Sequence, residues 1–181
     1  MAQQLTRREI EAAVERLLRE HAVDSVPVPV EAIARAVGLP VVEAEMHDDV
    51  SGALIKGGDI QGIAVNASQA PVRKRFTIAH ELGHHLLNHV DKDHLDWHFT
   101  VIRRDGRSSE AEDEQEIMAN FFAASLLMPK HMLRKDVERK KRFDGEVSLD
   151  DADVQILARK YKVSESAMRY RLQNLAFLSW A

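Results

Sequence analysis

The pattern His80-Glu81-Leu82-Gly83-His84 is the part of this sequence that most constrains the local fold. Residues i and i+4 of an α-helix lie one above the other on the same face, so this spacing brings two imidazoles together. Apolar residues around the pattern recur at helical spacing and predict a helix with one buried face: Phe76, Ile78, Ala79, Leu82, Leu86 and Leu87. Both histidines are therefore expected at the edge of the core, where a buried imidazole needs a bonding partner.

Two imidazoles on one helical face can bind one divalent metal ion. Glu81 is rotated around the helix from this pair, so its carboxylate can reach a water at the metal without binding the metal. That is the position of a general base. The alternative is that His80 and His84 are core residues satisfied by hydrogen bonds, because a chain with 9 histidines can contain the pattern by chance.

The composition limits the kind of protein and the kind of metal site. A chain of 181 residues with 45% hydrophobic residues is long enough for one well-buried domain and a small appended module. Its net charge of −4 argues against binding to nucleic acid or anionic membranes through bulk charge. Because the chain has no cysteine, metal ligands must be His, Asp or Glu. With no apolar run near membrane-spanning length, we expect a soluble protein of the reducing cytoplasm.

Local signals predict an α+β fold. Thr6 and Glu9 have the spacing of a capping box, Gly38 can end a second short helix, and Pro71 can begin the helix with the two histidines. The expected elements are helices over 6–21, 30–37, 71–87, 109–128 and 129–140, strands over 41–46, 52–55, 60–65 and 98–102, and two further helices between 149 and 175. Ser164 is the expected N-cap of the last helix. Together they predict a small three- to four-stranded sheet, a mainly helical zincin-type core and a C-terminal helix-turn-helix-like module.

A catalytic metal usually has three protein ligands and one open position, so a third ligand must come from another segment. Glu116 begins the apolar half of the helix predicted over 109–128, where a carboxylate is costly to bury without a cation. Asn120, four residues later, lies on the same helical face and is expected to orient a ligand histidine through a hydrogen bond. A third histidine in the extended pattern HExxHxxGxxH is excluded, because this chain has Leu87 and Val90 where glycine and histidine would be needed.

Other residues compete for the third position. Glu112 shares the face of Glu116 one turn earlier and is the main competitor. The acidic residues of this segment can instead form a solvated helix N-terminus: Glu110, Glu112, Asp113, Glu114 and Glu116. Four histidines are less suited, because one points away from the pair and the others lie at the helix end or in the following connection: His85, His89, His94 and His98.

Two long segments resemble a known family. FTIAHELGHHLLNH, followed about thirty residues later by EIMANFFAASLLMP, closely resembles the ImmA/IrrE family of metallopeptidases, and the strands GALIKG and IAVN and the segment VSESAMRYRL extend the likeness. The resemblance implies a thermolysin-like site in which His80, His84 and Glu116 bind the metal and Glu81 is the catalytic base. It implies Zn²⁺, with Mn²⁺ as the alternative. Many relatives have a second glutamate where this chain has Met118, which favours Glu116 over its neighbour.

The resemblance also implies an organisation and a partner. We expect residues 1–147 to form the metallopeptidase domain and residues 148–181 a helical module packed on it. The expected substrate is a separate regulatory protein, a helix-turn-helix repressor or an antitoxin-like protein, as in stress responses and transcription regulation. An edge strand of the hairpin over 52–66 is expected to bind extended substrate by strand addition. Tyr161 and Tyr170 are the tyrosines available to stabilise an oxyanion, although each is better suited to packing between helices.

A different class of function competes with the peptidase. Ala158, Val163 and Met168 have helix-turn-helix-like spacing, and Arg169 and Arg171 could face a DNA groove, which would make the chain a transcriptional regulator with a structural metal site. Residues 148–181 have a net charge of only +1. We therefore expect the module to pack or to bind a protein partner rather than DNA.

Overall fold

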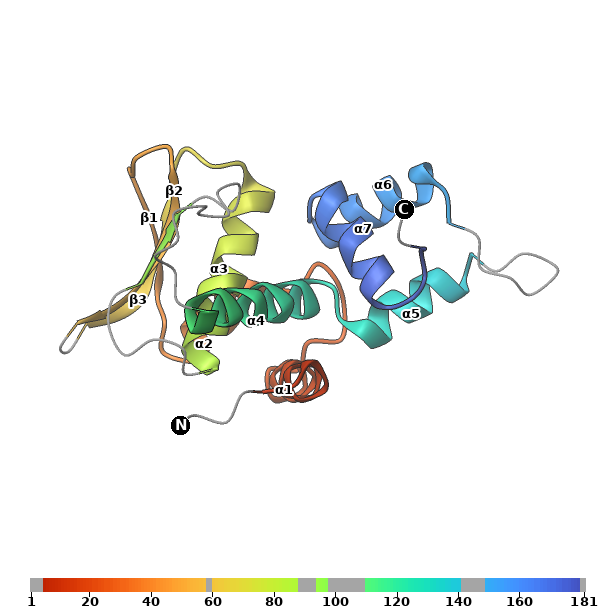
Figure 1. Cartoon of the computed structure of the whole chain (residues 1–181), viewed down its shortest axis with the longest axis horizontal. Helices are drawn as coiled ribbons and strands as arrows, with labels where there is room; N and C mark the ends of the chain where they lie inside the picture. The colour runs from red at the N-terminus through yellow and green to blue at the C-terminus, as the bar shows by residue number, and fades with distance from the viewer. Residues whose placement is uncertain (1–4, 58–59, 88–93, 98–109, 141–148, 180–181) are drawn as a thin grey trace.

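The structure, a computed structural model, describes residues 5–57, 60–87, 94–97, 110–140 and 149–179, with the side chains of 60, 94–97 and 110–113 excepted. These residues form an α+β fold (Figure 1). The helices are α1 (Arg7–Glu20), α2 (Val30–Ala36), α3 (Pro71–Leu86), α4 (Glu110–Leu127), α5 (Lys130–Glu138), α6 (Asp151–Tyr161) and α7 (Glu165–Asn174). The strands are β1 (Val41–Ala44), β2 (Val50–Gly57), β3 (Ile60–Asn66) and β4 (His94–Trp97).

The described strands form one mixed sheet in the order β1-β3-β2-β4. β1 is parallel to β3, whereas β2 is antiparallel to both β3 and β4. The hairpin over 52–66 therefore provides the two inner strands, and the expectation that it supplies an edge for substrate is wrong. The partners that cover it, β1 and β4, lie outside the hairpin itself, so the local pattern of the hairpin could not reveal which strands pair with it. The strand expected over 98–102 lies outside the described residues, and the fourth strand that the structure shows ends at Trp97.

Most helix boundaries follow the local signals. Thr6 and Glu9 form the expected capping box, in which the Thr6 hydroxyl accepts a hydrogen bond from the Glu9 backbone N–H at 3.3 Å. Gly38 adopts φ +88°, a conformation that glycine tolerates, directly after α2. Ser164 caps α7 by accepting from the backbone N–H of Ala167 at 3.2 Å. Pro71 lies in the first turn of α3, as predicted.

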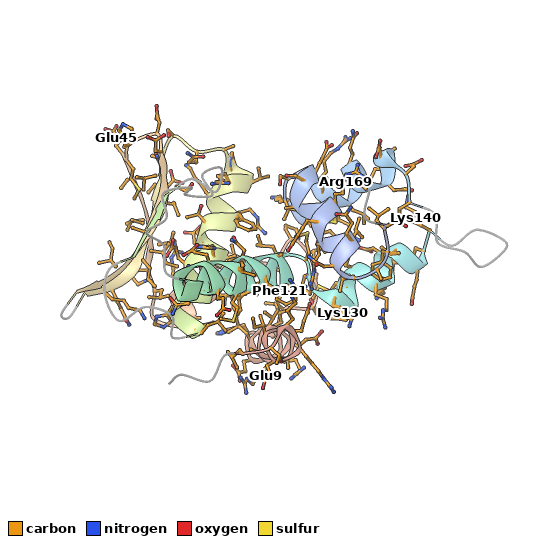
Figure 2. The ribbon with its side chains drawn as sticks, in the orientation of Figure 1. Glu9, Glu45, Phe121, Lys130, Lys140 and Arg169 are labelled. Carbon is orange, nitrogen blue, oxygen red and sulfur yellow. The ribbon has the colours of Figure 1, made fainter. Side chains whose placement is uncertain are left out.

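The layers place α3 at the centre of the molecule. One side of α3 packs against β2 and β3, and α4 packs on α3 with α1 beyond it (Figure 1). Gly52 allows the close approach of α3 to the sheet, because a Cβ at this position would lie 2.4 Å from Cγ2 of Thr77. Phe121, labelled in Figure 2, lies between α4 and α1, where the guanidinium of Arg7 stands 5.4 Å from its ring centroid.

The last three helices lie at the far end of α4 from the sheet (Figure 1). Asp136 joins α5 to α6, because it accepts hydrogen bonds from Nζ of Lys160 at 2.6 Å and from the hydroxyl of Tyr161 at 2.8 Å. Arg75 of α3 donates to the backbone carbonyl of Lys162 at 3.3 Å. The domain boundary predicted after residue 147 falls outside the described residues and stays a prediction. Within the described ranges, no helix combines the length and apolarity needed to cross a membrane.

Candidate metal centre

Three residues of α3 and one of α4 build the centre. His80 and Glu81 are 0% exposed and His84 is 1% exposed, so the HELGH segment lies inside the protein rather than at its boundary. Glu116 reaches the histidines from α4, and its side chain remains 39% exposed. The site is thus buried on the α3 side and open on the side of Glu116.

The ligand atoms converge closely. Nε2 of His84 lies 3.0 Å from Nε2 of His80 and 3.1 Å from Oε1 of Glu116. Oε2 of Glu116 lies 3.3 Å from Nε2 of His80. The two imidazole rings meet edge to face, with their planes at 74°. One atom from each of the three residues can be chosen so that all three lie within 4.8 Å of one another.

Gly83 explains how α4 comes close enough to supply its carboxylate. A Cβ on Gly83 would lie 3.1 Å from Cδ1 of Phe122 and 3.3 Å from backbone atoms of Ala119, both on α4. The missing side chain therefore permits the tight α3–α4 contact. Ala119 follows Glu116 by about one helical turn, so this contact also sets the depth of Glu116.

The donor set fits a divalent cation. Two zinc-bound nitrogens at about 2.0–2.1 Å in tetrahedral geometry lie about 3.3 Å apart, close to the separation of the two Nε2 atoms. Imidazole nitrogens in their neutral form and a carboxylate oxygen can each offer a lone pair, so one cation could satisfy all three groups together. The arrangement of two histidines and one carboxylate is typical of catalytic zinc sites, which keep one position open.

The competing ligands named above do not join the centre in the described part of the chain. The structure does not describe the side chains of four of them: Glu112, His89, His94 and His98. His85 is half-buried and lies on another face of α3, where burial and the nearby charge of Lys56 lower the pKa of its imidazole. Glu114 is exposed. Of the candidate ligands whose side chains the structure describes, His80, His84 and Glu116 are the ones that come together.

The hydrogen bond expected from Asn120 is absent. Oδ1 of Asn120 is buried and accepts no hydrogen bond from any part of the chain that the structure describes, so it does not orient His80 or His84. The i,i+4 relation to Glu116 places the residue beside the site but does not determine the rotation of its amide. Asn120 instead lines a cleft next to the centre.

The two tyrosines occupy different environments. Tyr161 is 0% exposed and donates its hydroxyl hydrogen to Asp136, so it packs within the C-terminal helices. Burial and this hydrogen bond raise the pKa of Tyr161 well above its usual range. Tyr170 is 44% exposed and lines the cleft that contains Asn120. Sequence reasoning did not anticipate this cleft, because its walls come from three separate helices.

Two known proteins resemble this chain, one in sequence and one in structure. Along 77 residues, 42% of this chain, the sequence is 34% identical to the radiation response metalloprotease IrrE of Deinococcus radiodurans, but the match spans only 22% of that protein. In structure, 92% of the chain resembles a Mycobacterium tuberculosis transcriptional regulator with a TM-score of 0.64 and 19% identity, over 46% of that protein. This second likeness concerns the fold alone.

The family comparison covers most of the chain. The model of the IrrE N-terminal-like domain, a peptidase family, matches residues 34–173. The matched range includes the HELGH helix, the helix of Glu116 and most of the C-terminal helices. With the metal-ligand geometry and this match in agreement, the chain belongs to the peptidase family described as the IrrE N-terminal-like domain.

Proposed function

We propose that this protein is a metal-dependent endopeptidase whose metal is held by His80, His84 and Glu116. The observation that carries the proposal is the convergence of these three side chains, with atoms of all three within 4.8 Å of one another, beside the buried Glu81. Family membership supports a metallopeptidase. Because the matched relatives extend well beyond this chain, the activity of the whole protein is part of the proposal.

Each residue has a distinct role in this reaction. When bound, a divalent metal supplies Lewis acidity toward water and the scissile carbonyl. Glu81 accepts a proton from the attacking water and delivers it to the leaving amine. His80 and His84 stay neutral so that their Nε2 lone pairs can bind the metal, and Glu116 balances part of its charge.

We propose Zn²⁺ as the metal, with Mn²⁺ as the alternative. Two imidazole nitrogens favour zinc over the harder cations Mg²⁺ and Ca²⁺, which prefer ligand sets made of oxygen. The absence of cysteine from the sequence leaves a site of intermediate softness, which Mn²⁺ can also occupy. Competition between the two metals in equilibrium dialysis would distinguish them.

We also propose that the substrate is a regulatory protein, a helix-turn-helix repressor or an antitoxin-like protein. One relative supports a regulatory setting through its name, which is that of a radiation response metalloprotease. In this proposal the substrate is a separate polypeptide. Incubating the metal-loaded protein with repressors encoded next to it, and mapping the products by mass spectrometry, would identify the cleaved bond.

Direct DNA binding is not part of the proposal. Arg171, one of the two arginines that could have faced a groove, is 0% exposed and pairs with Glu11. Arg169 is exposed but pairs with Asp151 at 2.6 Å. Both arginines are thus engaged within the protein, and we expect binding to duplex DNA to be weak.

Substitution of Glu81 tests the enzymatic proposal. Glu81→Gln removes the base while keeping the shape of the side chain, so we expect normal metal content and a loss of cleavage of about 100-fold or more. Elemental analysis and a single-turnover cleavage assay measure the two properties. Undiminished biological activity in the metal-loaded variant would support the alternative, a regulator with a structural metal.

A further inference from the structure

A cleft of about 700 Å³ lies where α3, α4 and α7 meet. Its walls are mainly apolar, and the described residues that line it include one cation and no acid. We call it the α3–α4–α7 cleft. Its lining on α3 includes Val72 and Phe76, its lining on α4 includes Ile117 and Asn120, and its lining on α7 includes Tyr170.

The cleft is lined by residues that lie one helical turn from two of the metal-centre residues, on the same two helices. Phe76 precedes the ligand His80 by one helical turn, and Asn120 follows the ligand Glu116 by one turn. Ala124, two turns beyond Glu116, also lines it. One turn of helix is about 5.4 Å and one residue of extended peptide is about 3.3 Å. The cleft therefore spans positions about two to three residues from a peptide bond held at the metal.

Large apolar side chains are exposed in this cleft. Val72 is 37% exposed, Tyr170 is 44% exposed and Ile117 is 55% exposed. They come from three helices and make up three of the seven large hydrophobic residues that are exposed in the described part of the chain. Such a gathering in a concave region marks a binding site more strongly than the same residues scattered singly.

Asn120 indicates what kind of ligand fits. Its Oδ1 is buried and accepts no hydrogen bond from the described residues. A half-turn of the terminal amide exchanges Oδ1 and Nδ2, so the side chain can offer an acceptor or a donor to the cleft. A peptide backbone carries both an N–H donor and a C=O acceptor that can bond to this amide. A hydrocarbon ligand would leave the amide unbonded.

We propose that the α3–α4–α7 cleft binds an apolar stretch of the peptide substrate, with bulky side chains about two and three residues from the cleaved bond. This inference rests on the proposed function, since it assigns the metal centre as the place of cleavage. The C-terminal helix α7 then acts as one wall of the substrate site. Asn120 holds the backbone of the same stretch.

Binding tests the cleft without requiring turnover. The probe is a synthetic decapeptide with a central Leu-Phe-Leu stretch, compared with a decapeptide in which Ser-Gln-Ser replaces that stretch, each added to zinc-loaded Glu81→Gln protein. Methyl NMR signals of Val72, Ile117 and Val163 should shift saturably with the apolar peptide alone. Absence of a saturable shift at millimolar peptide would overturn the proposal.

The chain offers a matched pair of variants. Ile117→Ser removes an exposed isoleucine of the cleft, and Ile156→Ser removes one of similar exposure, 51%, on α6 outside it. We expect Ile117→Ser and Tyr170→Ser to weaken binding of the apolar peptide about tenfold, and Ile156→Ser to leave it unchanged. Metal content is measured in each variant, because Ile117 adjoins Glu116. A dimer that forms with rising concentration and is abolished by Ile117→Ser would instead assign the cleft to a second copy of this chain.

Cleavage of a proteome-derived peptide library distinguishes the proposed peptide-binding cleft from the proposed peptidase activity. Sites enriched in leucine, isoleucine or phenylalanine about two and three residues from the bond would support both proposals. Cleavage without such enrichment, unaffected by Tyr170→Ser, would refute the cleft and leave the peptidase intact. Saturable peptide binding at the cleft without cleavage by metal-loaded wild-type protein would refute the peptidase and leave the cleft as a peptide-binding site.

Discussion

Arg171 and Glu11 form a two-pronged ion pair that joins the last helix of the chain to the first. Nη1 of Arg171 lies 2.6 Å from Oε1 of Glu11, and Nη2 lies 3.2 Å from Oε2. Nε of Arg171 also donates to the backbone carbonyl of Met128 at 3.1 Å. The guanidinium is completely buried, so its three nitrogens serve the interior of the protein and not an external ligand.

Replacing Arg171 should therefore lower the free energy of unfolding. Arg171→Ala removes the guanidinium that pairs with Glu11 and donates to the carbonyl of Met128, and we expect a loss of about 3 kcal/mol in the free energy of unfolding. Urea denaturation followed by circular dichroism measures it. Arg169→Ala is the matched control on the same helix, because its pair with Asp151 is exposed and should contribute less than about 1 kcal/mol. Equal losses in the free energy of unfolding for the two substitutions would show that the buried pair stabilises the fold no more than the exposed pair.

Glu116 should decide metal occupancy. Glu116→Ala removes one of three ligands, and we expect zinc affinity to fall by about 100-fold or more, because two imidazoles alone make an incomplete site. Isothermal titration with zinc measures the change, and Glu114→Ala on the same helix is the control. Full occupancy in Glu116→Ala combined with loss in Glu112→Ala would move the ligand assignment one turn earlier on α4.

Gly83 should control the distance between the two helices of the centre. In Gly83→Ala the new methyl group presses against Phe122 and the backbone of Ala119, so α4 must shift by a few tenths of an ångström and carry Glu116 with it. We expect zinc affinity to fall about tenfold, a typical cost of disturbing the support of a metal ligand. The higher helix propensity of alanine, about 1 kcal/mol, offsets part of the packing strain, so affinity is a sharper readout than stability. Unchanged affinity would mean that α4 moves without displacing the carboxylate.

Tyr161 should produce a decline in stability at alkaline pH. Burial and the hydrogen bond to Asp136 raise the pKa of its hydroxyl in the folded protein, so the folded state retains a proton that the unfolded chain loses above its ordinary value of 10.0. The stabilisation is therefore complete below pH 10.0 and is lost as the pH rises from there.

Tyr161→Phe measures this contribution. At neutral pH we expect a loss of about 1–3 kcal/mol, because Asp136 is left without one of its donors. The difference in unfolding free energy between wild type and variant should shrink above pH 10.0, when the wild type loses its advantage. Tyr170→Phe, at an exposed position, should keep the wild-type decline. A constant difference across this pH range would argue against a raised pKa at Tyr161.

The sequence determined those features that depend on neighbours within one turn of chain. The capping box of Thr6 and Glu9, the helix end at Gly38 and the cap at Ser164 all appear as predicted. His80 and His84 converge for the same reason, since four residues of helix bring two side chains together whatever lies around them. These contacts form within the helices themselves, so a single segment of sequence is enough to predict them.

The tertiary structure decided which distant residues meet. Glu116 is in reach of the histidines because the lack of a side chain at Gly83 lets α4 approach α3. The hairpin strands are not at the edge of the sheet because β1 and β4 pair with them. Arginine is usually a surface residue, but Arg171 is buried, because Glu11 at the other end of the chain neutralises its charge. Each outcome depends on packing between segments far apart in sequence, which local periodicity does not encode.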